Sequence, residues 1–196
     1  MFKAKSLFFH RNGHHILRDL SFEVEPGNCL IVRGPNGVGK STLLRLIAGF
    51  IQPTSGSLSF NGIQIDNSLE FSSEHIEYIG HSDGVKKTMS IIETIHLWNR
   101  LYENPSSKRP SRMKISEIIN RQISRCSAGQ IKRFSLSRLE LTRKKIWLLD
   151  EPTSAIDDIS AVHLKEIIEQ HCLSGGIAIV ATHDDLKYGT NTELLL

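Results

Sequence analysis

The stretch Gly34-Pro35-Asn36-Gly37-Val38-Gly39-Lys40-Ser41 decides the fold class, because it fits the pattern G-x-x-x-x-G-K-[ST]. The apolar run at 29–32 predicts a buried strand before it, and residues 41–48 are expected to form a helix after it. Glycines let the backbone wrap a phosphate closely, so that N–H groups and the helix N-terminus point at the anion. We therefore predict a nucleotide-binding loop that continues to Thr42, with Lys40 on the β- and γ-phosphates and the Ser41 hydroxyl on Mg²⁺.

A second apolar strand, expected at 145–149, ends in two carboxylates, Asp150 and Glu151. The carboxyl ends of parallel strands form the edge of a sheet where ligands bind. We expect Asp150 to hold Mg²⁺ through its water shell and Glu151 to polarise the water that attacks the γ-phosphate. An isolated Asp-Glu pair is also compatible with a solvated strand end, but beside a phosphate loop it indicates ATP hydrolysis.

Length, composition and charge exclude several classes of protein. The 196 residues suit one domain, and 39% hydrophobic with 23% charged residues excludes collagen-like, disordered and coiled-coil chains. A net charge of +3 is too small to indicate a nucleic-acid partner. No stretch has the length of a membrane span or a signal-peptide core, which favours a cytosolic protein. Three cysteines without a CxxC pair are expected to be small buried side chains rather than disulfides or zinc ligands: Cys29, Cys126 and Cys172.

Strand and helix patterns alternate along most of the chain. Strands are expected at 6–9, 16–24, 57–60, 76–80 and 177–181, and helices at 90–102, 127–141 and 157–170. Ser90 and Glu93 have the spacing of a capping box. These patterns predict an α/β fold with a mostly parallel sheet, an antiparallel N-terminal β part and a helical insertion at about 82–139, within a single domain at 1–196.

The segment Cys126-Ser127-Ala128-Gly129-Gln130 resembles the signature motif of ABC-type ATPases, usually written LSGGQ, with Cys for Leu and Ala for the first Gly. Ser127 and Gly129 are expected to open a helix, so that a hydroxyl and free N–H groups face a γ-phosphate. The resemblance implies the P-loop NTPase core of the ABC ATPase type. It also implies a head-to-tail homodimer, in which Ser127, Gly129 and Gln130 contact the nucleotide of the other protomer.

Two further segments resemble the same family. Residues 151–157 are similar to the acidic strand end that runs into the D-loop, and Thr182-His183-Asp184 is similar to the switch-histidine segment. The resemblance implies that Asp157 couples the two active sites. It implies that His183 contacts the γ-phosphate and holds the attacking water, although a histidine at a strand end is by itself an ordinary surface residue.

The chain departs from the family pattern at two positions. His81 stands where most of these ATPases have a Gln that touches Mg²⁺ and senses the membrane partner. A neutral imidazole can accept a hydrogen bond from metal-bound water, whereas its protonated form would oppose the cation. Arg11 stands nearest to the place of the aromatic residue that stacks on adenine, and a guanidinium can also stack on a base. The preference for ATP over GTP is therefore left open.

The segments 77–86 and 93–98 resemble the ATPase subunits of cytochrome c maturation exporters, a subfamily of ABC ATPases. The resemblance implies membrane permease subunits as partners, a place on the cytoplasmic face of the inner membrane, and a role in heme export or in the release of heme from its carrier. An exporter for another substrate and a nucleic-acid-directed ABC ATPase are the alternatives. The latter proteins usually carry a long coiled coil or two cassettes, and no heptads separate Lys40 from Ser127.

An apolar stripe along the helix expected at 90–102 has two interpretations. Ile91, Ile95, Trp98 and Leu101 recur with helical spacing. If exposed, the stripe would form a ridge or groove for a cytosolic helix of a membrane subunit. The alternative is that these side chains pack within the insertion.

Overall fold

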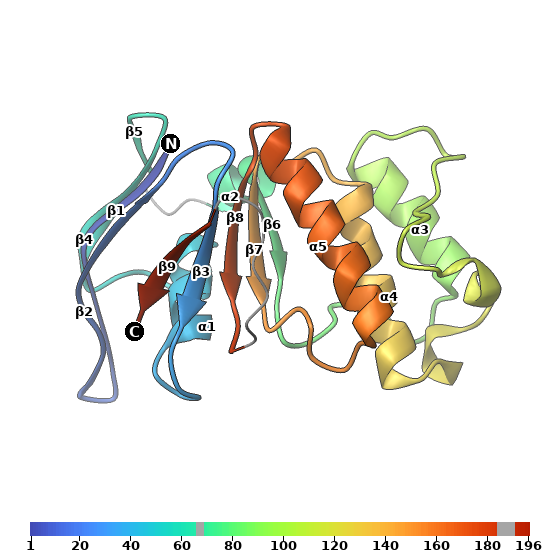
Figure 1. The fold of residues 1–196 in the computed structure, drawn as a ribbon, viewed down its shortest axis with the longest axis horizontal. Coiled ribbons are helices and arrows are strands. Elements are labelled where there is room, and N and C mark those ends of the chain that lie inside the picture. The colour runs from blue at the N-terminus through green and yellow to red at the C-terminus, as the bar shows by residue number, and fades with distance from the viewer. Residues whose placement is uncertain (66–68, 184–190) are drawn as a thin grey trace.

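The computed structural model describes residues 1–65, 69–183 and 191–196, and these form two sheets with helices around them (Figure 1). The antiparallel sheet has the strand order β2-β1-β4-β5, with β1 Phe2–Arg11, β2 His14–Val24, β4 Ser55–Phe60 and β5 Ile63–Ile65. The parallel sheet has the order β6-β7-β8-β3-β9, with β3 Cys29–Arg33, β6 Ile76–Ile79, β7 Ile146–Asp150, β8 Ile177–Ala181 and β9 Asn191–Leu195. The predicted α/β class, with its antiparallel N-terminal part, is confirmed.

The helices follow the strands in the expected order. They are α1 Lys40–Ile47, α2 Leu69–His75, α3 Ile91–Leu101, α4 Ala128–Ser137 and α5 Asp158–Leu173, with short 3₁₀ turns η1 Ser116–Ile118, η2 Ile123–Arg125 and η3 Arg138–Glu140. Figure 1 shows α3, α4 and α5 together on one side of the parallel sheet. No helix within the described ranges is long and apolar enough to cross a membrane.

The parallel sheet separates two hydrophobic cores. Successive side chains of a strand point to opposite faces, so Cys29 and Ile31 pack with α3, α4 and α5. Leu30 and Val32 pack instead with α1 and the antiparallel sheet. Because both faces of the parallel sheet are covered, its central strands are apolar throughout. The sequence therefore shows these strands as uninterrupted apolar runs.

Capping residues determine where α3 begins and where α1 ends. The predicted capping box on α3 is present: the Glu93 backbone N–H donates to Ser90 Oγ at 3.3 Å, and the Ser90 backbone N–H donates to Glu93 Oε2 at 2.7 Å. Gly49 ends α1 with a φ of 74°, and the N–H of Phe50 donates to the carbonyl of Arg45. This left-handed glycine after the last turn is a common C-terminal cap.

The apolar stripe of α3 lies mostly inside the protein. Ile91, Ile95 and Trp98 are buried, so the interpretation that these side chains pack within the helical part is correct and an exposed ridge is not formed by them. Only Leu101, 66% exposed, points to solvent. Cys29 and Cys172 are buried as expected, whereas Cys126 is half-buried, and all three are free thiols.

Candidate active site

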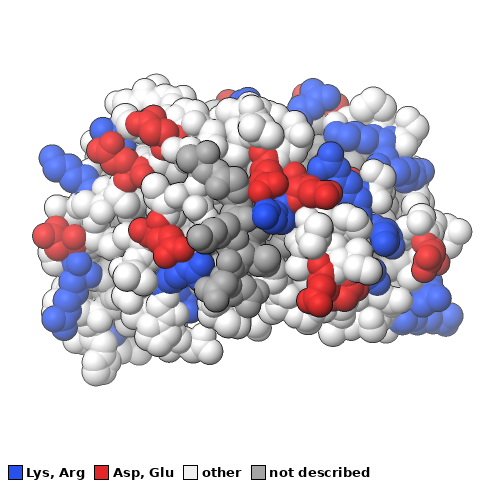
Figure 2. Space-filling model, in the orientation of Figure 1, with Lys and Arg blue, Asp and Glu red and all other residues white. Residues whose placement is uncertain are grey.

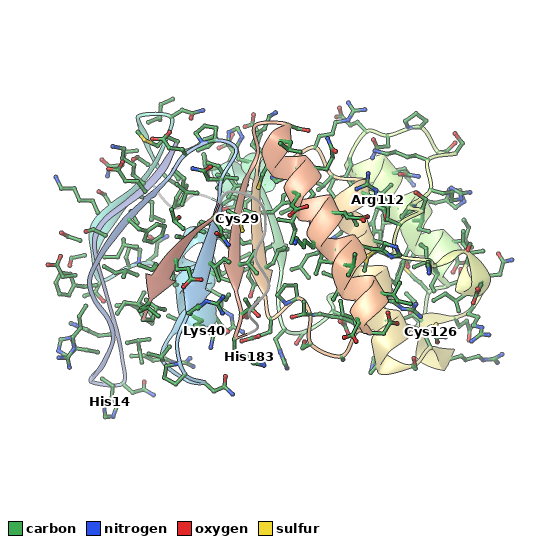
Figure 3. The ribbon with its side chains drawn as sticks, in the orientation of Figure 1. His14, Cys29, Lys40, Arg112, Cys126 and His183 are labelled. Atoms are coloured by element: carbon green, nitrogen blue, oxygen red, sulfur yellow. The ribbon has the colours of Figure 1, made fainter. Side chains whose placement is uncertain are left out.

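A cavity of about 450 Å³ lies at the carboxyl ends of the parallel strands. It brings together the phosphate-loop stretch, the end of β7 and the segment after β8. In Figure 3 the labelled side chains Lys40 and His183 lie close to each other at this end of the sheet. The lining residues are Asn36, Gly37, Gly39, Lys40, Ser41, Thr42, His81, Asp150, Glu151, Ser154 and His183.

The loop before α1 needs its glycines for both backbone angle and space. Gly34 has a φ of 147° and Gly39 a φ of 123°, which disfavour side chains. A Cβ on Gly34 would lie 2.9 Å from Val38 Cγ1, and one on Gly39 would lie 3.0 Å from Ile16 Cγ2. The loop is therefore packed closely against its own residues and against β2.

Lys40 is 6% exposed and its ammonium is held by the loop that precedes it. Its Nζ donates to the carbonyls of Gly34 at 2.8 Å and Pro35 at 3.4 Å, and lies 3.6 Å from Glu151 Oε1. The positive charge is thus fixed between the loop and the end of β7. A phosphate entering the loop would meet a cation that is already positioned.

Ser41 and Asp150 meet across the cavity, as the sequence predicts for two ligands of one metal ion. Ser41 Oγ donates to Asp150 Oδ1 at 3.0 Å. Asp150 is 1% exposed, and its Oδ2 has no hydrogen-bond partner in the described part of the chain. A buried carboxylate oxygen without a partner beside a hydroxyl oxygen fits the oxygen preference of Mg²⁺.

Glu151 and His183 form a pair above this site. His183 Nδ1 lies 3.0 Å from Glu151 Oε2. The backbone of Glu151 has a φ of 46°; its N–H donates to the Ala181 carbonyl, and its own carbonyl accepts from the Ser154 hydroxyl at 2.8 Å. The chain turns sharply here, which aims the carboxylate at the cavity instead of continuing the alternation of β7. Asp184, which follows the histidine, lies outside the described residues.

The signature residues do not line this cavity. Ser127 caps α4, where it accepts from the Gln130 N–H at 3.3 Å while Gln130 Oε1 accepts from the Ser127 N–H at 3.0 Å. Gly129 packs against the next loop, since a Cβ there would lie 2.8 Å from the Ala155 carbonyl oxygen. Figure 3 places Cys126, the residue before Ser127, well apart from Lys40. The predicted nucleotide contacts of Ser127, Gly129 and Gln130 are therefore not made from within the same chain.

Two other predicted residues also lie outside the cavity. Asp157 accepts from the Ser160 N–H at 2.8 Å at the start of α5, and these hydrogen bonds hold the pKa of its carboxyl below the usual value. Arg11 ends β1, paired with His14 at the hairpin tip. His81, by contrast, lines the cavity, as its predicted place near the metal requires.

Ser154 lines the cavity but was not predicted from the sequence. It lies within the acidic segment 151–157, but nothing in that spacing distinguishes its hydroxyl from those of its neighbours. Its function follows from the turn at Glu151, whose carbonyl it binds. This contact depends on the positive φ of Glu151, which the sequence does not reveal, so no sequence signal identified Ser154.

Comparison with protein families agrees with this geometry. The family model described as ABC transporter matches residues 17–154. The chain is 34% identical over 203 residues to the cytochrome c biogenesis ATP-binding export protein CcmA of Paramagnetospirillum magneticum, covering 100% of this chain and 93% of the relative. It is 37% identical to the CcmA of Ruegeria pomeroyi, covering 94% and 85% of the two chains.

Solved structures share the fold at lower identity. An ATP-binding subunit of an ABC transporter superposes with a TM-score of 0.83 at 21% identity, covering 93% of this chain and 79% of that chain. A dimeric ATP-binding cassette bound to ADP and Pi in a post-hydrolysis state superposes with a TM-score of 0.78 at 21% identity, covering 94% and 88%. These values show the same architecture of two sheets and flanking helices.

Proposed function

Because this chain belongs to the ABC transporter family and is an ATP-hydrolysing subunit of that class, we propose that it powers a membrane exporter in the maturation of c-type cytochromes. The observation that carries the proposal is similarity over nearly the whole chain to proteins named as cytochrome c biogenesis ATP-binding export proteins. The cavity geometry supports the hydrolytic part. Heme export, or release of heme from its carrier, is the transport step that we assign to the complex.

We assign a separate role in ATP hydrolysis to each group of cavity residues. Lys40 would exchange the carbonyls of Gly34 and Pro35 for the β- and γ-phosphates, which the N–H groups of the loop also bind. Ser41 and Asp150 would hold Mg²⁺, with His81 at the edge of the site. When bound, this ion neutralises phosphate charge and so favours attack at phosphorus.

Glu151 is the residue that we assign as general base. Its carboxylate reaches the cavity beside Lys40, and an oxygen there can take a proton from the attacking water. His183, 3.0 Å from the same carboxylate, would orient Glu151 and hold the water against the γ-phosphate. The pair is thus arranged as a base and its positioning partner.

We propose that a second copy of the chain completes the site. Ser127, Gly129 and Gln130 begin a helix whose N-terminal N–H groups can bind an anion, yet they lie away from the cavity of their own chain. In a head-to-tail dimer the helix start of one protomer would cover the γ-phosphate of the other. Asp157, near the same surface, would then link the two sites.

We propose that the exporter also includes membrane subunits, because transport across a bilayer requires a structure that spans it. We assign the chain to the cytoplasmic face of the inner membrane, bound to permease subunits of a cytochrome c maturation exporter. The helical segment at about 82–139, which begins beside His81, is the part that we expect to transmit opening of the dimer to those subunits. Nucleic acid is not expected as a partner.

The test is a heme stain of c-type cytochromes in source cells that are depleted of this protein. Complementation with the wild-type chain should restore the stained bands, whereas Glu151→Gln should not, because the amide cannot accept the proton of the attacking water. Glu166→Gln, the same change on the exposed face of α5, is the matched control and should restore them.

Two results would contradict the proposal in different ways. Intact cytochromes in depleted cells would reject the role in cytochrome c maturation and leave an ABC ATPase that serves another exporter. Full complementation by Glu151→Gln would instead reject the assignment of Glu151 as the base.

A further inference from the structure

A second cavity, of about 390 Å³, lies at the opposite end of the parallel sheet from the nucleotide site. It is formed where β7 and β8 begin, by the segment before β7, the end of α5 and Gly176. Its volume is within the range of small-molecule sites. Figure 3 shows Arg112, one of its lining residues, far from Lys40 and His183.

The rim of this cavity is strongly basic. Arg112, Arg143 and Lys145 line it and are exposed, and none has an ion-pair partner among the residues that the structure describes. Lys144 also lines it, but its ammonium is occupied by the Ile76 carbonyl at 2.9 Å and by Glu77 at 3.7 Å. Figure 2 shows blue side chains gathered over the upper right of this face, in the part of the molecule where Figure 3 labels Arg112. Three uncompensated cations around one cavity attract an anion.

Glu140, which also lines the cavity, offsets only part of this charge, because the cations of the rim outnumber it. Glu140 Oε2 already accepts from the backbone N–H groups of Ser111 at 2.9 Å and Arg112 at 3.1 Å. Its carboxylate therefore fixes the 111–112 segment in place and positions Arg112 on the rim. Glu140 Oε1 is buried and has no hydrogen-bond partner in the described ranges.

Trp147 and His171 line the cavity and pack closely against each other. Trp147 is 4% exposed and stacks on His171 with 3.7 Å between ring centroids and 6° between planes. A Cβ at Gly176 would overlap the His171 ring, so the imidazole is enclosed on that side as well. Trp147 Nε1 is buried and finds no acceptor within the described chain. Burial lowers the pKa of His171 to about 4, so the ring is neutral at pH 7 and the charge of the site comes from its Arg and Lys residues.

We propose that this cavity is a binding site for a small polyanion that carries phosphate or carboxylate groups, separate from the nucleotide site. The two guanidinium groups on the rim match the paired oxygens of either group, and Lys145 adds a third charge. Trp147 lines the same cavity, so an anion bound there would lie beside the indole ring. The proposal does not depend on which exporter the chain serves.

Trp147 provides a direct readout. In a Trp98→Phe background it is the remaining tryptophan, so its fluorescence reports on this cavity. The protein would be saturated with ADP, to occupy the phosphate loop, and titrated with pyrophosphate and separately with citrate. Sodium chloride of matched ionic strength is the reference for non-specific screening. We expect a saturable fluorescence change with half-saturation below about 1 mM for at least one of the two anions.

Two double variants of equal charge make the test specific. Arg143→Ala with Lys145→Ala should weaken binding at least tenfold, while Arg100→Ala with Arg121→Ala, both exposed and outside the cavity, should leave it unchanged. All four side chains are exposed, and thermal unfolding would verify that each variant folds. Binding of pyrophosphate alone identifies a phosphate ligand, and binding of both anions identifies a general oxyanion site. No saturable change with either anion, or equal weakening in the two double variants, would overturn the proposal.

Discussion

Gly129 has no Cβ, which lets α4, the helix that begins with the signature residues, pack closely against the loop after β7. An added Cβ would lie 2.8 Å from the Ala155 carbonyl oxygen, a distance that real Cβ atoms essentially never show. The start of α4 can therefore approach the 151–157 loop only with glycine here. Ala128, one residue earlier, has no such restriction in the sequence or the fold, which explains why the chain can depart from the family pattern there and not at Gly129.

We predict that Gly129→Ala lowers the free energy of unfolding by about 1–3 kcal/mol and reduces ATPase activity, because α4 must move away from the loop. Urea unfolding and phosphate release would measure the two effects. Ala128→Gly, which restores the usual family residue, should keep the activity. A Gly129→Ala protein that is as stable and active as the wild type would contradict the close contact with Ala155.

His171 predicts a pH dependence of stability. Burial lowers its pKa from 6.5 to about 4 in the folded protein, so between these values the unfolded chain binds a proton that the folded chain does not. Stability contributed by the neutral ring is fully present above pH 6.5 and is lost as pH falls toward 4, by an amount of at most about 3 kcal/mol.

The measurement is urea unfolding at several pH values from 7 to 4.5. His171→Phe keeps the stacking on Trp147 and does not titrate, so its free energy of unfolding should fall less steeply with decreasing pH than that of the wild type. His96→Phe, at an exposed position of α3, controls for the loss of a histidine. Parallel pH curves for the wild type and His171→Phe would show that His171 does not contribute.

The strands that are most easily predicted from the sequence are those buried on both faces. β3, β7 and β8 are uninterrupted apolar runs, and their ends were placed within a residue or two. β1 is longer than the predicted 6–9, because Ser6, with a φ of 45°, introduces a bulge that breaks the two-residue alternation.

Three short elements were not predicted at all. β5 has three residues, too few for a periodic pattern. α2 has seven residues and little apolar periodicity, and β9, Asn191–Leu195, is a largely exposed edge strand. Such elements exist because neighbours pair with them, β9 with β3 for example, and this tertiary contribution is absent from local sequence.

The bulge between β1 and β4 leads to a prediction about Gly56. It has a φ of 94°, and a Cβ there would overlap the Ser6 carbonyl of the neighbouring strand. Gly56→Ala should destabilise the protein by about 3 kcal/mol or more, since left-handed backbone strain adds to a clash between main chains. Gly62→Ala is the matched control: its φ is 82° but nothing lies within 4 Å, so we expect a loss of about 1 kcal/mol. Equal melting temperatures for the two variants would contradict this packing.

The proposed active site has one part that the sequence locates and one part that it does not. The residues at this site lie at or after the carboxyl ends of strands of one parallel sheet, and parallel strands bring these ends to a common edge: Lys40, Ser41, Asp150, Glu151 and His183. Motif spacing therefore predicted that Lys40, Ser41, Asp150 and Glu151 meet, whereas the place of His183 was predicted from the family resemblance. The distance of Ser127 from the same cavity depends on how the helical layer packs, which no motif records, and only the family resemblance suggested that a second chain is involved.

We predict that two inactive variants with defects in different parts of the site complement each other in a mixed dimer. If each site combines the phosphate loop of one chain with the signature of another, Lys40→Ala and Ser127→Arg should each abolish ATPase activity alone, because both sites of either homodimer are defective. In a mixed dimer the two defects fall in the same site, and the other site has an intact Lys40 and an intact Ser127. An equimolar mixture of the two variants should therefore regain up to about a quarter of the wild-type rate, since half of the random dimers carry one working site. A site built within one chain would remain defective in every molecule, so a mixture no more active than its components would reject the two-chain site. Glu166→Gln mixed with Lys40→Ala supplies the reference for a partner whose signature and loop are both intact.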